Sequence, residues 1–293
     1  MPEQKRKRRL GDRRDAHKIR TLPPMDYVGI AIMNKRNDAQ NMFSASLDFA
    51  AVEEYIRQKR EELPGFGFMH LVTAAYVRVV SQKPGVNRYI AGLRVFARHE
   101  IVLSMMVKKE LKLNAQESSI KVRFSPYDTA EDVYRKMEAE IEKARQAGDT
   151  TNLDNVSRVV NHLPALLLRG FVSFNQFLDF FGWMPKFINE ASPMHCSIFI
   201  SNLGSLGIPP VFHHLYNFGN VPVFLTFGGK RKELAFRSDG TVYNRTMVDY
   251  TVVMDERTID GHYYASALKL FDKILHNPEK LDVPPETVIE DVD

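Results

Sequence analysis

The chain has 293 residues, of which 44% are hydrophobic and 26% are charged. This balance is typical of a folded globular protein and excludes collagen-like, coiled-coil and fully disordered chains. The single cysteine, Cys196, has no partner for an intramolecular disulfide, and no apolar cleavable leader follows Met1. Both observations favour a reducing compartment, so we expect a cytoplasmic location.

The net charge of +4 is unevenly distributed along the chain. Residues 1–20 contain nine basic and three acidic side chains, a local charge of +6, which leaves about −2 for the remaining residues. A nucleic-acid-binding domain spreads its basic side chains over a folded face, and the sequence predicts no such face. We therefore expect a solvated basic arm and no nucleic-acid partner; contact of the arm with the phosphates of a nucleotide-like ligand, or with an acidic partner, is the alternative.

The first half of the chain predicts two helices followed by a strand meander. Apolar residues at helical spacing predict helices over residues 48–63 and 68–83, each ended by a Pro-Gly pair. Short runs rich in β-formers then predict strands over residues 93–97, 101–108 and 119–124.

The middle of the chain is helical and ends in an unusually aromatic segment. A capped helix is predicted over residues 129–148, and leucines and phenylalanines recur at helical spacing over residues 163–181. We expect this aromatic face to pack in the core or between subunits; an acyl-chain pocket or a membrane surface is the alternative. Only nine residues separate Arg169 from Asp179, too few to cross a bilayer, so no membrane span is predicted.

The last third predicts strands over residues 197–201 and 221–228, a hairpin around a Ser-Asp-Gly turn, and a helix over residues 261–276. Strands and helices alternate without a separating linker or an internal repeat. The sequence therefore predicts one α/β domain with a mixed sheet. The expected organisation is a basic arm over residues 1–20, a domain over 21–281 and an acidic tail over 282–293.

Two short motifs carry a resemblance to a known family. Residues 200–204 read Ile-Ser-Asn-Leu-Gly, and residues 255–261 read Asp-Glu-Arg-Thr-Ile-Asp-Gly. In their order and in the hairpin between them, they resemble the Ile-Ser-Asn-Leu-Gly and Asp-His-Arg-x-x-Asp-Gly stretches of one catalytic domain. Chloramphenicol acetyltransferase and the dihydrolipoamide acyltransferases of 2-oxo acid dehydrogenase complexes share this domain, and the resemblance extends over residues 12–281.

The resemblance implies a chloramphenicol acetyltransferase-like two-layer α/β sandwich with a mixed sheet. It further implies a homotrimer with active sites between neighbouring subunits, in which an acyl group moves between coenzyme A and a small-molecule or lipoyl acceptor. The lipoate-using enzymes carry lipoyl domains before the catalytic domain, and we identify none in this sequence. The expected acceptor is therefore a free small molecule or a lipoyl arm on another protein.

The same resemblance assigns roles to single residues. Ser201, next to Asn202, would donate its hydroxyl to the oxyanion of the tetrahedral intermediate; the structural alternative is a strand-end serine bonded to backbone. Asp260 would hold the catalytic loop through an N-terminal arginine, for which Arg13 is the nearest match and Arg14 the alternative. A helix N-terminal acid is equally compatible with Asp260.

The sequence departs from the family at its central residue. Glu256 occupies the position at which the family has the histidine that removes the proton from the attacking group. The next residue, Arg257, is expected to support the site. Glutamate is the weaker base, and losing a positioned base typically costs 10²–10⁴-fold in rate. Two hypotheses follow: an acyltransferase in which Glu256 or a nearby histidine is the base, or an inert trimer that binds a ligand or scaffolds a complex. The remaining candidates are His262 as a substitute base, and His195, His213, His214 and Tyr216 as residues lining the channel.

Metal chemistry is not expected. The adjacent histidines at positions 213 and 214 have no accompanying Cys, His or carboxylate at metal-ligand spacing.

Overall fold

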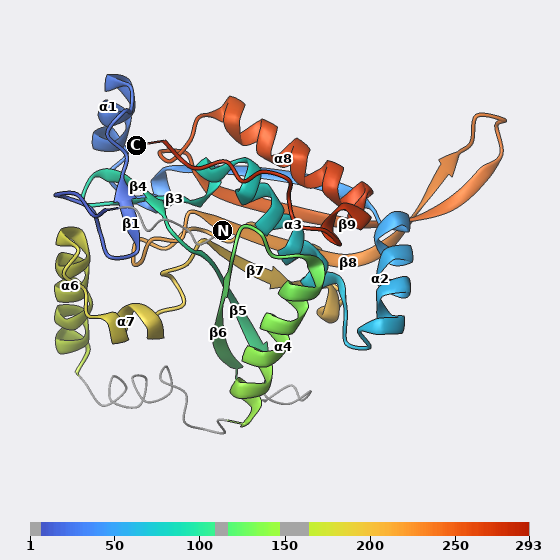
Figure 1. Ribbon diagram of the computed structural model, residues 1–293, viewed down its shortest axis with the longest axis horizontal. Coiled ribbons are helices and arrows are strands. Elements are labelled where there is room, and N and C mark those ends of the chain that lie inside the picture. Colours follow the sequence, from blue (N-terminus) through green and yellow to red (C-terminus); the bar gives the residue numbers. More distant parts are fainter. Residues whose placement is uncertain (1–6, 109–116, 147–163, 293) are drawn as a thin grey trace.

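A six-stranded mixed sheet forms the body of the computed structural model, which describes residues 7–108, 117–146 and 164–292 (Figure 1). Its strand order is β2-β9-β8-β7-β5-β6, with β7 parallel to both of its neighbours and the other pairs antiparallel. The strands are β2 (Gln40–Asp48), β5 (Ile101–Lys108), β6 (Glu117–Phe124), β7 (Ile198–Asn202), β8 (Val223–Phe236) and β9 (Val242–Asp255).

Four helices cover one face of this sheet and enclose the main core (Figure 1). They are α2 (Ala50–Glu62), α3 (Phe68–Gln82), α4 (Ala130–Gln146) and α8 (Gly261–His276). Alternate strand residues point toward them, such as Ile198 and Ile200 of β7 and Val252 of β9. The two-layer α/β sandwich with a mixed sheet is therefore confirmed, and the four helices begin and end within a few residues of the predicted bounds.

An extended segment covers the opposite face of the sheet. Phe199, Phe224 and Val253 point to this side and pack with Leu215 of the segment. The segment lies close against the strands, because a Cβ added at Gly228 would be 2.5 Å from the ring of Pro210. Residues 208–216 thus run across the sheet from the end of β7 toward the end of β9.

A small antiparallel sheet lies beside the body, with strand order β1-β4-β3. Helix α1 packs on it through Ile30, which meets Ile90 and Val95. The end of the chain also lies here, where Asp291 forms an ion pair with Arg88 at 2.6 Å. Residues from the expected basic arm and from the acidic tail are therefore built into the fold. The elements are β1 (Ala16–Lys18), α1 (Pro24–Ile32), β3 (Arg88–Ala91) and β4 (Arg94–Arg98).

Two features extend beyond the sequence predictions. The predicted hairpin consists of two strands of 14 residues each, β8 and β9, interrupted by a bulge between Phe227 and Lys230, and its tip projects from the body (Figure 1). Neither β2 nor α1 was predicted from the sequence. The strand β2 lies at an edge and its residues are mostly exposed, so it lacks the alternation of a half-buried strand.

The aromatic segment forms α6 (Ala165–Phe181), followed by the short helix α7 (Lys186–Ala191). Helix α6 lies beside β3 of the small sheet, whereas α7 contacts Lys121 and Arg123 of β6. Only Asn175 of α6 is buried within the described chain. The prediction that its aromatic face packs in the core is therefore wrong for the single chain. No helix in the described ranges is long and apolar enough to cross a bilayer.

Two phenylalanines of β8 provide a matched test of the core, one in the body of the sheet and one near the hairpin tip. Phe227 is fully buried and makes edge contacts with Phe68, at 4.8 Å between ring centroids, and its ring also meets Tyr250. We expect Phe227→Ala to lower the free energy of unfolding by about 3–5 kcal/mol, because truncation leaves a cavity. Phe236→Ala, in the same strand but 75% exposed, is the control and should change it by less than about 0.5 kcal/mol. Urea unfolding measures both, and equal effects would contradict the assigned core.

Candidate functional site

The Asp-Glu-Arg turn after β9 is built around a buried carboxylate. Asp255 accepts two hydrogen bonds from Arg257, from Nε at 2.8 Å and Nη2 at 2.7 Å. The guanidinium of Arg36 lies on its other side, with Nε 3.4 Å from Oδ2. Arg36 also donates to the carbonyl oxygens of Tyr216 and Gly219, at 2.9 and 2.6 Å. The turn is thus tied to the segment that crosses the sheet.

Electrostatics make this cluster sensitive to the loss of any member. Asp255, Arg257 and Arg36 are all buried, and burial lowers the pKa of Arg36 while the Asp255 carboxylate opposes that shift. Breaking a buried charge cluster by removing one partner typically costs about 3–5 kcal/mol. The cluster therefore holds the turn in one conformation, and Arg257 braces the turn through Asp255.

The two acidic residues of the turn that face outward are Glu256 and Asp260. Glu256 is exposed, and its backbone N–H donates to the carbonyl of Ala39 at 2.9 Å. Asp260 caps α8, where its carboxylate accepts from the N–H of Tyr263 at 2.8 Å. His262 is exposed on the first turn of the same helix. One carboxylate and one imidazole thus flank the start of α8.

The expected pair of Arg13 with Asp260 needs correction. Arg13 binds Asp179 of α6, with Nη1 2.9 Å from Oδ1, and it also donates to the carbonyl of Phe180. The physical reason is that Asp260 is already held by the N-terminus of its own helix, while Arg13 precedes β1 beside α6. The arginines that brace the motif are Arg36 and Arg257.

His195 is buried inside the protein. Its Nδ1 is 2.8 Å from the hydroxyl of Ser192, and its Nε2 is 3.7 Å from Asp179 Oδ2. Burial lowers the pKa of His195. Burial alone would raise the pKa of Asp179, but His195 and Arg13 lower it to about 2.

Ser201 lies at the far end of β7, on the face opposite the helices. Its strand partner is Thr226 of β8, which in turn pairs with Thr251 of β9. Asn202 ends the strand, and its side chain accepts from the N–H of Gly204 at 2.9 Å. A short 3-10 helix over Leu203–Leu206 begins there.

Two histidines of the crossing segment lie on this same face. His213 stacks on Phe224, with 4.4 Å between ring centroids and 18° between planes. Burial and the neighbouring His214 lower the pKa of His213, so its imidazole is neutral near pH 7. His214 contacts the ring of Tyr216 at 4.7 Å, and both side chains are exposed. His213 is thus the candidate imidazole nearest to the Ser201 strand end.

The two motifs lie at opposite ends of the sheet. Ser201 is level with Thr251 through their shared neighbour Thr226, and Glu256 follows Thr251 by five residues. Five residues of strand span about 17 Å, and two strand spacings add about 10 Å sideways. A single chain therefore does not bring Ser201 to Glu256, Asp260 or His262.

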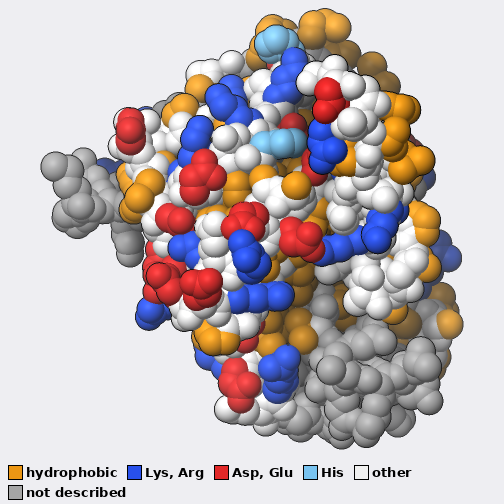
Figure 2. All heavy atoms as spheres, turned by 90° about the vertical axis from the view of Figure 1, so that its right-hand side faces the viewer, with side chains coloured by type: hydrophobic (Ala, Val, Ile, Leu, Met, Phe, Trp, Pro, Cys, Tyr) orange, Lys and Arg blue, Asp and Glu red, His pale blue; other side chains and the backbone are white. Residues whose placement is uncertain are grey.

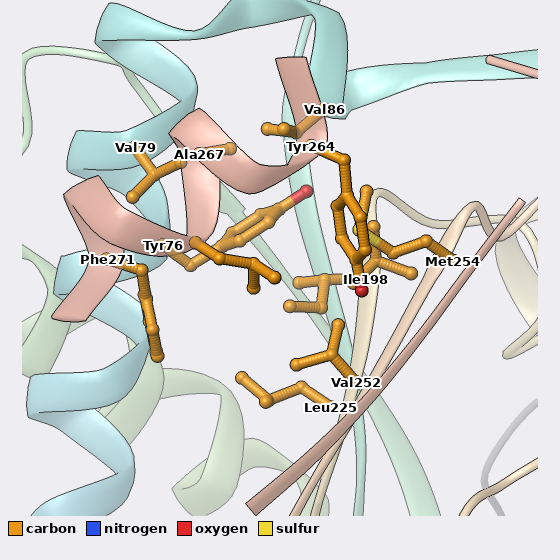
Figure 3. Close-up of a pocket in the computed structure, with 12 residues that line it drawn as sticks. Tyr76, Val79, Val86, Ile198, Leu225, Val252, Met254, Tyr264, Ala267 and Phe271 are labelled. Atoms are coloured by element: carbon orange, nitrogen blue, oxygen red, sulfur yellow. The ribbon is translucent and has the colours of Figure 1, made fainter. Parts of the chain in front are cut away.

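The structure contains two cavities near the candidate residues. A polar cavity of about 220 Å³ lies at the Glu256 end, between the crossing segment, α6 and the turn of the β3–β4 hairpin, and its charged walls include Lys35, Arg36, Asp179 and Arg257. A second cavity, of about 40 Å³, lies under α3 and α8 among apolar side chains (Figure 3). It is too small for an acyl chain.

No local pattern in the sequence points to Arg36 or Asp179, whose partners lie far along the chain. Asp255 is different, because it is the first residue of the recognised motif. An aspartate two residues before an arginine is the sequence signal that identifies it.

Comparisons with known proteins agree with this fold. The family model described as "2-oxoacid dehydrogenases acyltransferase (catalytic domain)" matches residues 189–283, a range that includes both motifs. No curated protein matches the sequence significantly. The chain has the fold of this class of acyltransferase catalytic domain, and the resemblance expected from the motifs is confirmed.

Three solved structures show the same fold over most of this chain. A probable dihydrolipoamide acetyltransferase from Listeria monocytogenes has a TM-score of 0.56 and 13% identity, covering 89% of this chain and 95% of its own. The cubic core of a pyruvate dehydrogenase multienzyme complex has a TM-score of 0.56 and 15% identity, with coverages of 90% and 94%. The dihydrolipoamide acetyltransferase of Azotobacter vinelandii has a TM-score of 0.55 and 13% identity, covering 94% of each chain.

The ion pair of Asp179 predicts a pH-dependent loss of stability. Because the pKa of Asp179 is lowered to about 2 in the folded state, its charge stabilises the protein above its unfolded value near 4 and this contribution is lost as pH falls toward 2. We expect Asp179→Asn to lower the free energy of unfolding by about 2 kcal/mol at neutral pH. Urea unfolding between pH 7 and pH 2 should show the two proteins converging in acid; a constant difference would contradict the assignment.

Proposed function

We propose that this chain is an acyltransferase that moves an acyl group between coenzyme A and a small-molecule or lipoyl acceptor. Its working form is a homotrimer in which Ser201 of one copy faces the Glu256 turn of the next. The observation that carries this proposal is the strand register, which separates the two motifs within one chain. We expect this chemistry in the cytoplasm, with a lipoyl-bearing protein as a possible partner and no metal.

A head-to-tail contact is the simplest way to join two separated half-sites. Ser201 lies at one end of the sheet and Glu256 at the other, so the surfaces that must meet are different. Unlike surfaces generate a ring when the rotation between copies closes. The similar pyruvate dehydrogenase protein is the cubic core of a multienzyme complex, which supports assembly through this fold.

The chemistry needs one donor and one base. The acceptor thiol or hydroxyl attacks the thioester carbonyl carbon, its proton passes to the base, and the carbonyl oxygen becomes an oxyanion. Ser201 donates its hydroxyl to that oxyanion, and coenzyme A leaves as the thiol when the tetrahedral intermediate collapses. In the Azotobacter vinelandii enzyme, a serine, a histidine and an asparagine were studied for their roles in catalysis, which supports a serine and a motif residue acting together.

Two groups are the candidates for the base. Glu256 is exposed on a turn that the buried cluster of Asp255 holds rigid, so its carboxylate reaches the neighbouring copy. His213 lies on the same sheet face as Ser201 and is a neutral imidazole near pH 7. We take Glu256 as the first candidate, because it occupies the position of the base in the motif.

The second candidate function is an inert trimer that binds a ligand or scaffolds a complex. Glu256 favours it, because a protein without catalysis tolerates a carboxylate where an imidazole is expected. The fold and the braced turn are the same in both cases, so only turnover separates them.

The activity prediction uses acyl transfer from acetyl- and longer acyl-coenzyme A to a small thiol. We expect Ser201→Ala to reduce turnover by about 10²-fold or more, because it removes the oxyanion donor. Glu256→Gln should abolish turnover, since an amide accepts no proton, and Glu256→His should raise it.

Ser205→Ala is the matched control. Ser205 lies in the 3-10 helix just after the motif and is exposed, so its loss should leave the rate unchanged. A native rate indistinguishable from the uncatalysed rate, with no gain from Glu256→His, would favour the inert scaffold. Robust turnover that survives Glu256→Gln would transfer the role of base to His213.

The assembly prediction uses two inactive variants in one mixture. Light scattering should give the mass of a trimer or of a multiple of it. Refolding equal amounts of Ser201→Ala and Glu256→Gln chains together should restore about a quarter of the native activity, because a quarter of the shared sites receive both native residues. A site within one chain would stay inactive in every mixture, and a monomeric mass would overturn the shared site.

A further inference from the structure

The largest unexplained surface is an exposed aromatic patch on α6, α7 and the loop between them. Ten large apolar side chains of this region are more than a third exposed in the single chain. Trp183 is 64% exposed and stacks on Phe181, which also contacts Phe177 and Phe180 at about 5 Å between ring centroids. The patch consists of Leu166, Leu167, Phe171, Val172, Phe174, Phe177, Phe180, Phe181, Trp183 and Phe187.

The polarity of α6 is the reverse of that of an ordinary surface helix. Such a helix turns its apolar stripe toward the core and its polar side toward water. Here the one buried residue is polar: Asn175 donates to the carbonyl of Phe171. Asp179 is half-buried and held by Arg13, and Leu168 and Leu178 are half-buried as well. The apolar side therefore points away from the protein, and the fold needs a cover for it.

The exposed charges of α6 and α7 that have no acidic partner are basic. Arg169 and Lys186 are exposed, whereas the two carboxylates, Asp179 and Glu190, are paired with Arg13 and Arg123. The ion pair of Arg13 with Asp179 also fixes the neighbouring Arg14, which is exposed, next to the end of α6. Apolar rings bordered by basic side chains complement a surface of acyl chains below anionic headgroups.

The hairpin end of a second copy is a poorer cover. The opposite end of the molecule carries the β8–β9 hairpin, whose exposed large apolar side chains are only Leu234, Phe236 and Val242. On that end, which faces the viewer in Figure 2, acidic and basic side chains are intermingled, including the pairs of Arg231 with Asp249 and Arg245 with Glu233. Three apolar side chains cover only part of a patch of ten.

We propose that α6 and α7 dock this protein on an anionic membrane surface. The aromatic patch inserts into the boundary between headgroups and acyl chains, and Arg14, Arg169 and Lys186 contact the anionic headgroups. This is peripheral binding, with the helix lying in the plane of the interface. It is independent of the transfer chemistry, since Ser201 and Glu256 contribute nothing to it.

The chain contains a built-in probe for the test. Trp183 is its only tryptophan and lies in the patch, so tryptophan emission reports on this surface alone. Full-length protein is mixed with vesicles of phosphatidylcholine, or of phosphatidylcholine and phosphatidylglycerol in equal parts. We expect a blue shift and co-sedimentation with the anionic vesicles, both weaker in high salt because screening removes the headgroup attraction.

Two variants separate insertion from charge. Phe174→Ser with Phe177→Ser should weaken vesicle binding about tenfold or more, because buried apolar area drives insertion. Phe236→Ser, on the hairpin and at least as exposed as either substituted phenylalanine, is the matched control and should bind like the native chain. Since the substituted side chains are exposed, thermal unfolding should be the same for all three proteins.

Two results would overturn the proposal. One is the absence of both the blue shift and co-sedimentation at every anionic content. The other is a native emission maximum that is already blue-shifted in the absence of vesicles. In that case the double variant Phe174→Ser with Phe177→Ser would show both a red shift of the emission and a lower molecular mass. That second result would assign the patch to an interface between copies.

Discussion

The buried Asp255 carboxylate is the interaction on which the arrangement of the candidate site depends. Arg257 binds it from within the motif, and Arg36 binds it from the segment before β2. Arg36 in turn holds the crossing segment through Tyr216 and Gly219. Desolvating two guanidinium groups and one carboxylate is expensive, so the cluster is stable only when all the partners are in place. The hydrogen bonds and ion pairs of this one carboxylate and its arginines therefore connect the motif turn, the crossing segment and the small sheet.

The rigidity of that turn makes sense of an exposed Glu256. A carboxylate on a mobile loop would reach a neighbouring copy in many orientations, whereas catalysis needs one geometry. Here the residues on both sides of Glu256 are buried and paired, so only its side chain is free to reach outward. Ser201 is prepared in the same way at the other end of the sheet, where the Asn202 cap ends the strand. In the proposed trimer, each chain would therefore present two half-sites, with Ser201 and Glu256 at separate ends of the sheet.

The sequence predicts the elements whose patterns are local. Helical periodicity located α2, α3 and α8, and the Ser-Asp-Gly turn located the hairpin, because each signal lies within one element. The partners of Arg13 were not predictable, since Asp179 lies 166 residues away and no local pattern reports such a distance. The motif likewise located Asp260 but did not predict its partner. The resemblance implies an arginine, whereas the carboxylate accepts a hydrogen bond from the backbone N–H of Tyr263 and caps α8.

Periodicity also identified the aromatic side of α6 but not the direction in which it faces. That direction is decided by polar contacts, because Asp179 meets Arg13 and His195, and Asn175 turns inward. These contacts hold ten large apolar side chains in water, each of which would gain about 1.5–3 kcal/mol on full burial. That cost is the physical reason for the proposed cover outside the chain. In this proposal the contacts of Asp179 and Asn175 set the orientation in which the aromatic side of α6 meets an external surface.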